Sequence, residues 1–163
     1  MQLSTQVLER NAKEFSEFQN LLIMNPPEND DIDFLTPKKV LTFDYRVYLS
    51  HKNELEDTIE FSLTHTPSSL YDGAVVFLPK SKGELDLMLA YITPMLEVGA
   101  DIYLVGEKKG GIASASKRLE NYGSDSSKLD SAKHCQLWHV CLKEKSKSFS
   151  IDSWIKTVDI TFN

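Results

Sequence analysis

The first 24 residues predict an amphipathic helix followed by a buried strand. Apolar side chains recur on one helical face of residues 4–18, at Val7, Leu8, Phe15 and Phe18. Ser4 and Thr5 suit the N-cap of that helix. Residues 21–24 are apolar without interruption, and Asn25-Pro26-Pro27 follows them. Because proline cannot extend a strand ladder, we interpret this run as a strand buried on both faces and ended by its prolines.

Residues 40–50 and 58–64 alternate between apolar and polar side chains. This period of two predicts a pair of strands that each have one solvated face. Only residues 51–57 connect them, and a parallel crossover needs a dozen or more residues. We therefore expect an antiparallel hairpin, with no crossover helix on this side of the sheet.

The segment from residue 73 onward predicts alternating strands and helices. Apolar runs at 73–78 and 102–105 indicate two further buried strands. Ser81 and Glu84 form a capping box before one helix, and residues 112–122 have the period of another. Residues 128–133 and 136–143 predict a hairpin that turns at Lys133 and His134. The pattern predicts a Rossmann-like α/β fold with an antiparallel C-terminal hairpin.

The last residues predict a short helix at 152–154 and an alternating strand at 157–162. That strand reaches Asn163 with no turn or cap after it. We expect that the chain has been cut from a longer one.

Composition narrows the class of protein. The chain has 163 residues, 41% hydrophobic and 26% charged, which fits one globular domain. The net charge of −6 argues against a dedicated nucleic-acid-binding protein, because such proteins usually carry an excess of basic residues. No segment has the length of a membrane span or the pattern of a signal peptide, so we expect a cytoplasmic protein without a membrane partner.

The two cysteines are expected to be structural thiols. Cys135 and Cys141 lie six residues apart in a predicted strand, which separates them by roughly 20 Å and excludes a disulfide between them. The four histidines lack Cys or Glu partners at metal-ligand spacing, so no metal is predicted. The acidic residues Asp30, Asp31 and Asp33 lack calcium-loop spacing and are interpreted as a solvated turn.

Nucleotide-binding motifs are absent where this fold class places them. The loop of residues 106–111 has glycines but lacks the Lys-Ser/Thr of a P-loop. No G-x-G-x-x-G follows the first strand, where close approach of a cofactor requires glycine. The sequence therefore predicts neither catalytic nor cofactor-binding residues in this chain.

Basic residues follow the predicted buried strands. Carboxyl ends of parallel strands are where ligands bind in open α/β sheets, and a helix beginning at Gly110-Gly111 favours phosphate. Solvated surface lysines remain the simpler interpretation. If RNA is contacted, the candidate phosphate-binding residues are Lys80, Lys82, Lys108, Lys109, Lys117, Arg118 and Lys133.

Three segments together carry a resemblance to a known family. They are Pro79-Lys80-Ser81-Lys82, the run from Val105 to Gly111, and the run from Lys128 to Cys135. In this order and spacing they resemble the N-terminal domain of the bacterial ribosomal RNA small subunit methyltransferase C family, the 16S rRNA guanine-N2 methyltransferases. The similarity extends from about residue 72 to 154, and before that only the order of segments agrees.

The resemblance implies a degenerate class I methyltransferase-type domain at 1–148, and a linker with the start of a catalytic domain at 149–163. It implies that S-adenosylmethionine binds in the C-terminal catalytic domain and not here, with that domain and 16S rRNA of the small ribosomal subunit as partners. The Asn-Pro-Pro of an amino-group methyltransferase belongs at the fourth strand, where this chain has Leu78-Pro79-Lys80. Its own Asn25-Pro26-Pro27 ends the first strand, and Glu28 replaces the aromatic residue.

Two alternatives stay open at this point. One is an autonomous methyltransferase with an unorthodox cofactor loop, and the other is a stand-alone protein-interaction module of Rossmann-like fold.

Overall fold

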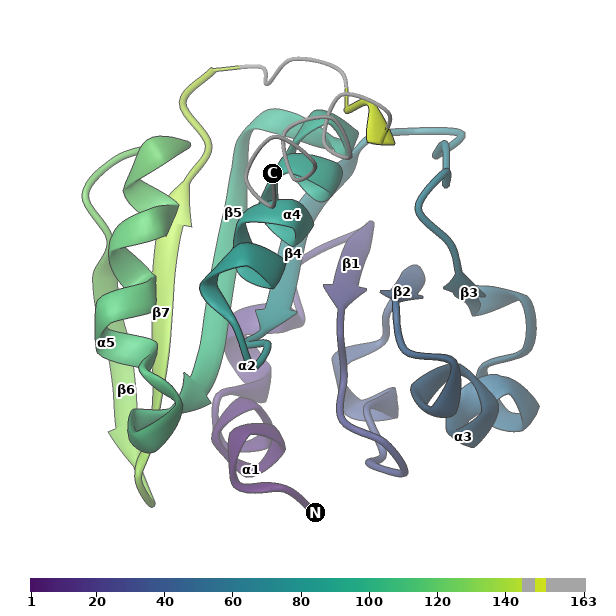
Figure 1. The fold of residues 1–163 in the computed structure, drawn as a ribbon, viewed down its shortest axis with the longest axis horizontal. Coiled ribbons are helices and arrows are strands. Elements are labelled where there is room, and N and C mark those ends of the chain that lie inside the picture. The colour runs from purple at the N-terminus through teal and green to yellow at the C-terminus, as the bar shows by residue number, and fades with distance from the viewer. Residues whose placement is uncertain (145–148, 152–163) are drawn as a thin grey trace, which may run out of the picture.

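A mixed β-sheet forms the centre of the computed structural model, which describes residues 1–144 and 149–151 (Figure 1). Within these residues the sheet has seven strands in the order β3-β2-β1-β4-β5-β7-β6. The first five in this order are mutually parallel, and β7 runs antiparallel to both β5 and β6. The strands are β1 (Leu21–Met24), β2 (Lys39–Thr42), β3 (Ile59–Phe61), β4 (Tyr71–Phe77), β5 (Leu96–Glu107), β6 (Ser127–Ala132) and β7 (Cys135–Cys141).

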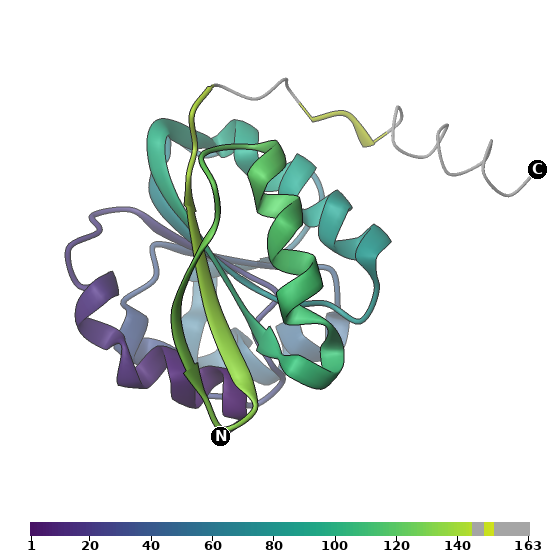
Figure 2. The same cartoon turned by 90° about the vertical axis from the view of Figure 1, so that its left-hand side faces the viewer.

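Helices cover both faces of the sheet (Figure 2). The helices are α1 (Leu3–Arg10), α2 (Ala12–Phe15), α3 (Tyr45–Leu55), α4 (Lys82–Ile92) and α5 (Ile112–Ala115). Side chains of α1, α2 and α3 share one buried cluster, and those of α4 and α5 share the other. Successive strand residues alternate between the clusters, so Leu22 faces α4 while Ile23 faces α1. This arrangement is the three-layer α/β fold that the sequence predicts.

The segment 40–64 differs from the prediction. β2 ends at Thr42, and residues 45–55 form α3 rather than a continued strand. Val47, His51 and Leu55 are its buried residues, four positions apart as on one face of a helix. β2 and β3 pair in parallel, with Val40 opposite Ile59. The predicted antiparallel hairpin is therefore wrong. The apolar residues in the first half of α3 happen to alternate with polar ones, which is the pattern expected of a strand.

The connection from β1 to β2 contains no α-helix. Between residues 25 and 38 the structure has only a 3₁₀ turn at Asp33–Leu35. The expected lack of crossover helices thus holds for this connection and is wrong for the one that contains α3. Asp30 also departs from the solvated turn predicted for it, since its carboxylate is buried and accepts a hydrogen bond of 2.6 Å from Thr5 Oγ1.

Residues 71–142 follow the prediction closely. β4 and β5 are parallel neighbours, and Ser81 caps α4 by accepting a 3.1 Å hydrogen bond from the Glu84 amide. The β6–β7 hairpin turns at Lys133 and His134, both with positive φ. Two predicted helices are interrupted: the first breaks at Asn11, and the last continues from α5 as a 3₁₀ helix.

The C-terminal predictions at 152–154 and 157–162 lie outside the described residues. The ring of Phe149 packs on Tyr91 of α4, with centroids 5.2 Å apart. Across the described part of the chain, no helix is both long and apolar enough to cross a membrane.

Candidate functional site

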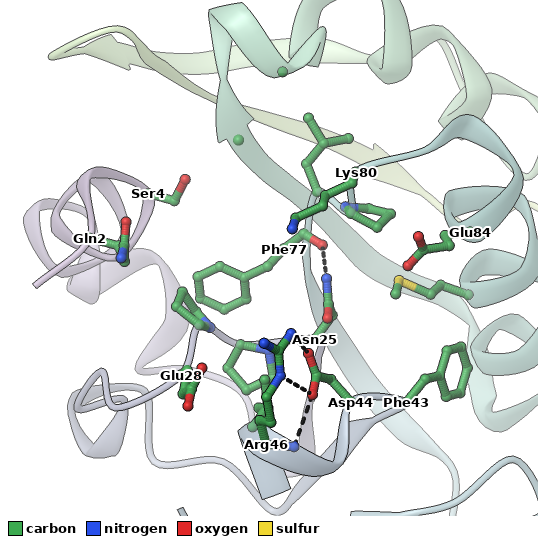
Figure 3. Close-up of a pocket in the computed structure, with 18 of the residues that line it drawn as sticks. Gln2, Ser4, Asn25, Glu28, Phe43, Asp44, Arg46, Phe77, Lys80 and Glu84 are labelled. Carbon is green, nitrogen blue, oxygen red and sulfur yellow. Dashed lines mark hydrogen bonds and ion pairs between the residues drawn. The ribbon is translucent and has the colours of Figure 1, made fainter. Parts of the chain in front are cut away.

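An open cleft of about 1100 Å³ lies at the carboxyl ends of β1, β4 and β5 (Figure 3). The order of strands reverses between β1 and β4, which makes this the topological switch point where ligands of open α/β sheets bind. The cleft is lined mainly by the loop after β1, the start of α3, the loop after β4 and the turn that follows β5. Residues at the start of α1, at the end of β3 and on α4 complete the lining.

The loop after β1 is fixed by its own contacts. The Asn25 side-chain amide donates to the Phe77 carbonyl at 3.1 Å, and its backbone amide donates to the Leu41 carbonyl at 2.9 Å. The buried His51 ring places Nε2 2.8 Å from the Pro27 carbonyl. Pro26 and Pro27 have no N–H, and no α-helix begins within residues 25–38 to aim free amides at an anion.

Asp44 stands at a position that cofactor sites of this fold class use. It follows β2, about twenty residues after β1, where an acidic residue of a dinucleotide-type site binds ribose. Here its carboxylate caps α3 by accepting from the Arg46 amide at 2.9 Å. It also accepts from the Arg46 guanidinium at 3.2 Å, and the hydrogen bonds from Arg46 hold the pKa of Asp44 below its usual value. Sequence reasoning missed Asp44, because the segment after it was interpreted as a strand.

Beyond β4 the cleft is lined by Leu78-Pro79-Lys80. Leu78 packs so closely on Gly106 of β5 that a Cβ at Gly106 would lie 2.6 Å from the Leu78 Cβ. Neither Leu78 nor Pro79 offers a side-chain donor or acceptor for a planar amine. These two residues therefore do not fit a planar amine, and the prolines after β1 offer no N–H to a cofactor.

The cleft is not positively charged. Four carboxylates line it, from Glu28, Asp44, Glu84 and Glu107. Three cations oppose them, from Arg46, Lys80 and Lys109. A polyanion would therefore be attracted only towards the Lys80 side of the cleft, where that side chain extends beside Phe77 (Figure 3).

Six of the seven predicted basic residues are exposed, and Arg118 is half-buried. Lys80 and Lys109 line the cleft. Lys109 lies 3.4 Å from Glu107, and Lys133 donates to Gln6 Oε1 at 2.9 Å. Arg118 donates to both carboxylate oxygens of Asp86, so its charge is already balanced.

A short helix begins directly after Gly110-Gly111, where the sequence predicts a phosphate-binding helix start. The helix that begins there, α5, has four residues. The Gly111 amide already donates to the Lys108 carbonyl at 3.0 Å. The Gly111 amide is therefore not free for an anion, and the lysine side chains are the charged groups at this edge.

Both cysteines are free thiols, in agreement with the geometric argument against a bridge. Cys135 is buried, and burial raises the pKa of its thiol. It is packed as a structural residue against the cluster under α1.

Two solved structures with the same fold are methyltransferases. The T. thermophilus 16S rRNA N2 G1207 methyltransferase in complex with AdoMet and guanosine matches 89% of this chain and 41% of its own, at 12% identity and a TM-score of 0.69. The N-methyltransferase NodS of Bradyrhizobium japonicum WM9 matches 86% of this chain at 14% identity and a TM-score of 0.59. The fold is accordingly the Rossmann-like α/β fold of class I S-adenosylmethionine-dependent methyltransferases.

Sequence comparison gives the family. A family model described as the methyltransferase small domain N-terminal matches residues 5–158, and the chain belongs to this family. The ribosomal RNA small subunit methyltransferase C of Aeromonas hydrophila is 38% identical over 154 residues, covering 92% of this chain and 45% of that protein. The protein of the same name from Psychromonas ingrahamii is 34% identical, and the match covers 98% of this chain and 47% of that protein. The chain thus spans about half the length of these relatives.

Proposed function

We propose that this chain is the non-catalytic N-terminal domain of an S-adenosylmethionine-dependent 16S rRNA guanine-N2 methyltransferase. It supports the catalytic domain of the same protein in the cytoplasm and helps to place the small-subunit RNA. In this proposal residues 1–148 form the domain, and residues 149–163 lead into the catalytic one. The cofactor is bound by that second domain and not by this one.

The loop after β1 is the observation that carries the proposal. A class I fold needs close backbone approach and a helix start at this point, and here two prolines and a 3₁₀ turn replace them. The fold is kept while the groups that would hold cofactor and amine are replaced. That combination is expected of a duplicated domain that has lost catalysis and retained a packing role.

Methyl transfer tests the catalytic part of the proposal. The purified chain, incubated with labelled S-adenosylmethionine and either naked 16S rRNA or small subunits, is expected to transfer no label. A relative of full length serves as the positive control. Label incorporated by this chain would favour the autonomous enzyme instead.

The role in RNA placement rests on Lys80, Lys82, Lys108 and Lys109. β4 and β5 are parallel neighbours, so the residues that follow them leave the sheet at one edge. Each phosphate contact contributes a salt-dependent increment to binding, with a slope of about 0.9 per contact for a duplex and 0.7 for a single strand.

A matched pair of fourfold variants tests this role. Replacing these four lysines by Ala is expected to weaken binding to 16S rRNA and to lower its salt dependence by up to about four contacts. The control replaces four exposed lysines elsewhere, at Lys13, Lys38, Lys52 and Lys143, and changes the net charge equally. Equal effects of both variants would leave only the supporting role.

A further inference from the structure

A second cluster of chemically active side chains lies at the opposite end of the sheet from the cleft. Asp101 stands on β5 and pairs with Cys141 of β7, while His139 of β7 stands opposite Tyr103 of β5. Because alternate strand residues share a face, Asp101, His139 and Cys141 all project on the α2 side. Asp101 also pairs with Gly73 near the start of β4, which places the cluster away from the carboxyl ends that line the cleft.

One oxygen atom joins the three residues. His139 Nε2 lies 2.7 Å from Asp101 Oδ1, and the Cys141 thiol donates to the same oxygen with Sγ 3.5 Å away. One potential ligand atom from each residue lies within 4.8 Å of the other two. The Gly99 carbonyl is a second acceptor for the thiol, with Sγ 3.6 Å away. The imidazole and the thiol thus both approach a single carboxylate oxygen.

We propose that Asp101, His139 and Cys141 bind a divalent transition-metal ion of the zinc class. Carboxylate, imidazole and thiolate are the three ligand types that zinc uses, and three protein ligands with one open position form a typical exposed zinc site. The ion takes the place of the two contacts that His139 and Cys141 make with Asp101 Oδ1. Binding forms metal–oxygen, metal–nitrogen and metal–sulfur bonds, and the thiol proton is released to solvent. The imidazole proton moves by exchange with water from Nε2 to Nδ1, which frees the Nε2 lone pair for the ion, and no oxidation state changes.

Two of the three distances between ligand atoms require little rearrangement, and the third, between sulfur and nitrogen, is within 4.8 Å. On a tetrahedral zinc ion, sulfur and oxygen ligands lie roughly 3.6 Å apart and nitrogen and oxygen roughly 3.3 Å, from the usual bond lengths. The sulfur–oxygen distance of 3.5 Å already has this value. The nitrogen–oxygen distance of 2.7 Å must lengthen by roughly half an ångström, which a small side-chain rotation provides.

The surroundings favour a cation. A polar hollow of about 470 Å³ beside the cluster is lined by Asp101 and Tyr103 together with four charged residues, Lys13, Glu14, Glu17 and Asp72. Four carboxylates therefore oppose one ammonium group at this edge. Tyr103 connects the hollow with the cluster of Asp101, His139 and Cys141. Its hydroxyl donates to Glu14 Oε1 at 2.9 Å, and its ring centroid is 5.0 Å from that of His139.

All three side chains are half-buried. The side chains of His139 and Asp101 retain 23% and 33% of their exposure, so an ion and its water can reach them. The spacing of histidines in the sequence predicted no metal, because Asp101 lies 38 residues before His139. His139-Val140-Cys141 was the available signal, since residues two apart on a strand face the same way. This inference does not depend on the proposed function.

Cobalt spectroscopy tests the site in the full chain after treatment with a chelator. Titration with Co²⁺ is expected to produce thiolate-to-cobalt charge-transfer absorption together with intense visible bands, and Zn²⁺ should abolish both. In Cys141→Ser the charge-transfer absorption is expected to disappear. In Asp101→Asn and His139→Gln the affinity should fall at least tenfold.

His134→Asn and Cys135→Ala are the matched controls, because they remove another histidine and the other thiol of the same hairpin. Both should bind Co²⁺ like the parent, and circular dichroism melts establish that each variant is folded. Zn²⁺ should raise the melting midpoint of the parent but not that of Cys141→Ser. The proposal is overturned if the parent shows no charge-transfer absorption, or if Cys141→Ser retains it.

Discussion

The two lateral halves of the sheet, called its two sides below, differ in the length of their strands. On one side β4, β5 and β7 have seven, twelve and seven residues and pair along most of their length. On the other side β1, β2 and β3 have four, four and three, and a 3₁₀ turn stands in place of the first crossover helix. A cofactor of this fold class lies mainly against the second side. This difference is what the proposed packing role without cofactor binding rests on.

The largest expected effect comes from the long-strand side. Leu104 of β5 is fully buried, so Leu104→Ala should lower the free energy of unfolding by about 3 kcal/mol. Phe61 of β3 is 50% exposed, and Phe61→Ala should cost less than about 1 kcal/mol. Urea unfolding measures both. Equal losses would mean that the two sides stabilise the domain equally.

The next effect concerns the buried carboxylate at the start of the chain. Asp30 accepts from the Thr5 hydroxyl and the Gln2 amide, so Asp30→Ala leaves partners unsatisfied and should cost about 1–3 kcal/mol. Asp33→Ala changes an exposed carboxylate in the same loop and should stay within about 0.5 kcal/mol. A similar loss in both variants would restore the interpretation of a solvated acidic turn.

A smaller effect compares one helix cap from each side. Ser81→Ala at α4 and Asp44→Ala at α3 each remove a side-chain acceptor and should cost about 1 kcal/mol. Ser81→Asp retains an acceptor and should restore most of the loss at α4. If Asp44→Ala costs nothing, Asp44 is not held as a cap and is available for a ligand.

The smallest effect is a dependence on pH. Asp130 of β6 accepts from Asn11 at 2.8 Å and pairs with Arg10, and the Asn11 hydrogen bond in particular lowers the pKa of this carboxyl. A lowered pKa in the folded state stabilises the protein above the unfolded value of about 3.9 and ceases to do so as pH falls through the folded value.

Asp130→Asn isolates this contribution. The parent should exceed the variant in stability by a constant amount above about pH 5. The difference should decrease as the pH falls below the ordinary aspartate pKa and vanish only below the lowered pKa of the folded state. Urea unfolding across this range provides the measurement. A difference that grows as the pH falls would have the wrong sign.

Sequence patterns predicted the long-strand side well for physical reasons. Uninterrupted apolar runs identify strands buried on both faces, and the Ser81 capping box fixes the start of α4. Residues 45–55 were not identifiable in this way, because Tyr45 and Leu49 are exposed apolar residues that completed a false alternation. Their helix depends on burying Val47, His51 and Leu55 against the sheet.

The sites depend on pairing that local patterns do not contain. The basic edge was predictable, because the direction of two parallel strands brings their ends together. The ion pair that neutralises Arg118 was not predictable, because its partner Asp86 lies 32 residues away on another helical segment. The cluster of Asp101, His139 and Cys141 likewise exists only because β7 inserts beside β5.

Calorimetric titration of the chain with S-adenosylmethionine tests the central claim most directly. The prolines after β1 and the engaged carboxylate of Asp44 predict no saturable heat, while an active methyltransferase in the same buffer gives a normal isotherm. Saturable binding in the micromolar range would contradict the account, because it would show that this sheet still holds the cofactor.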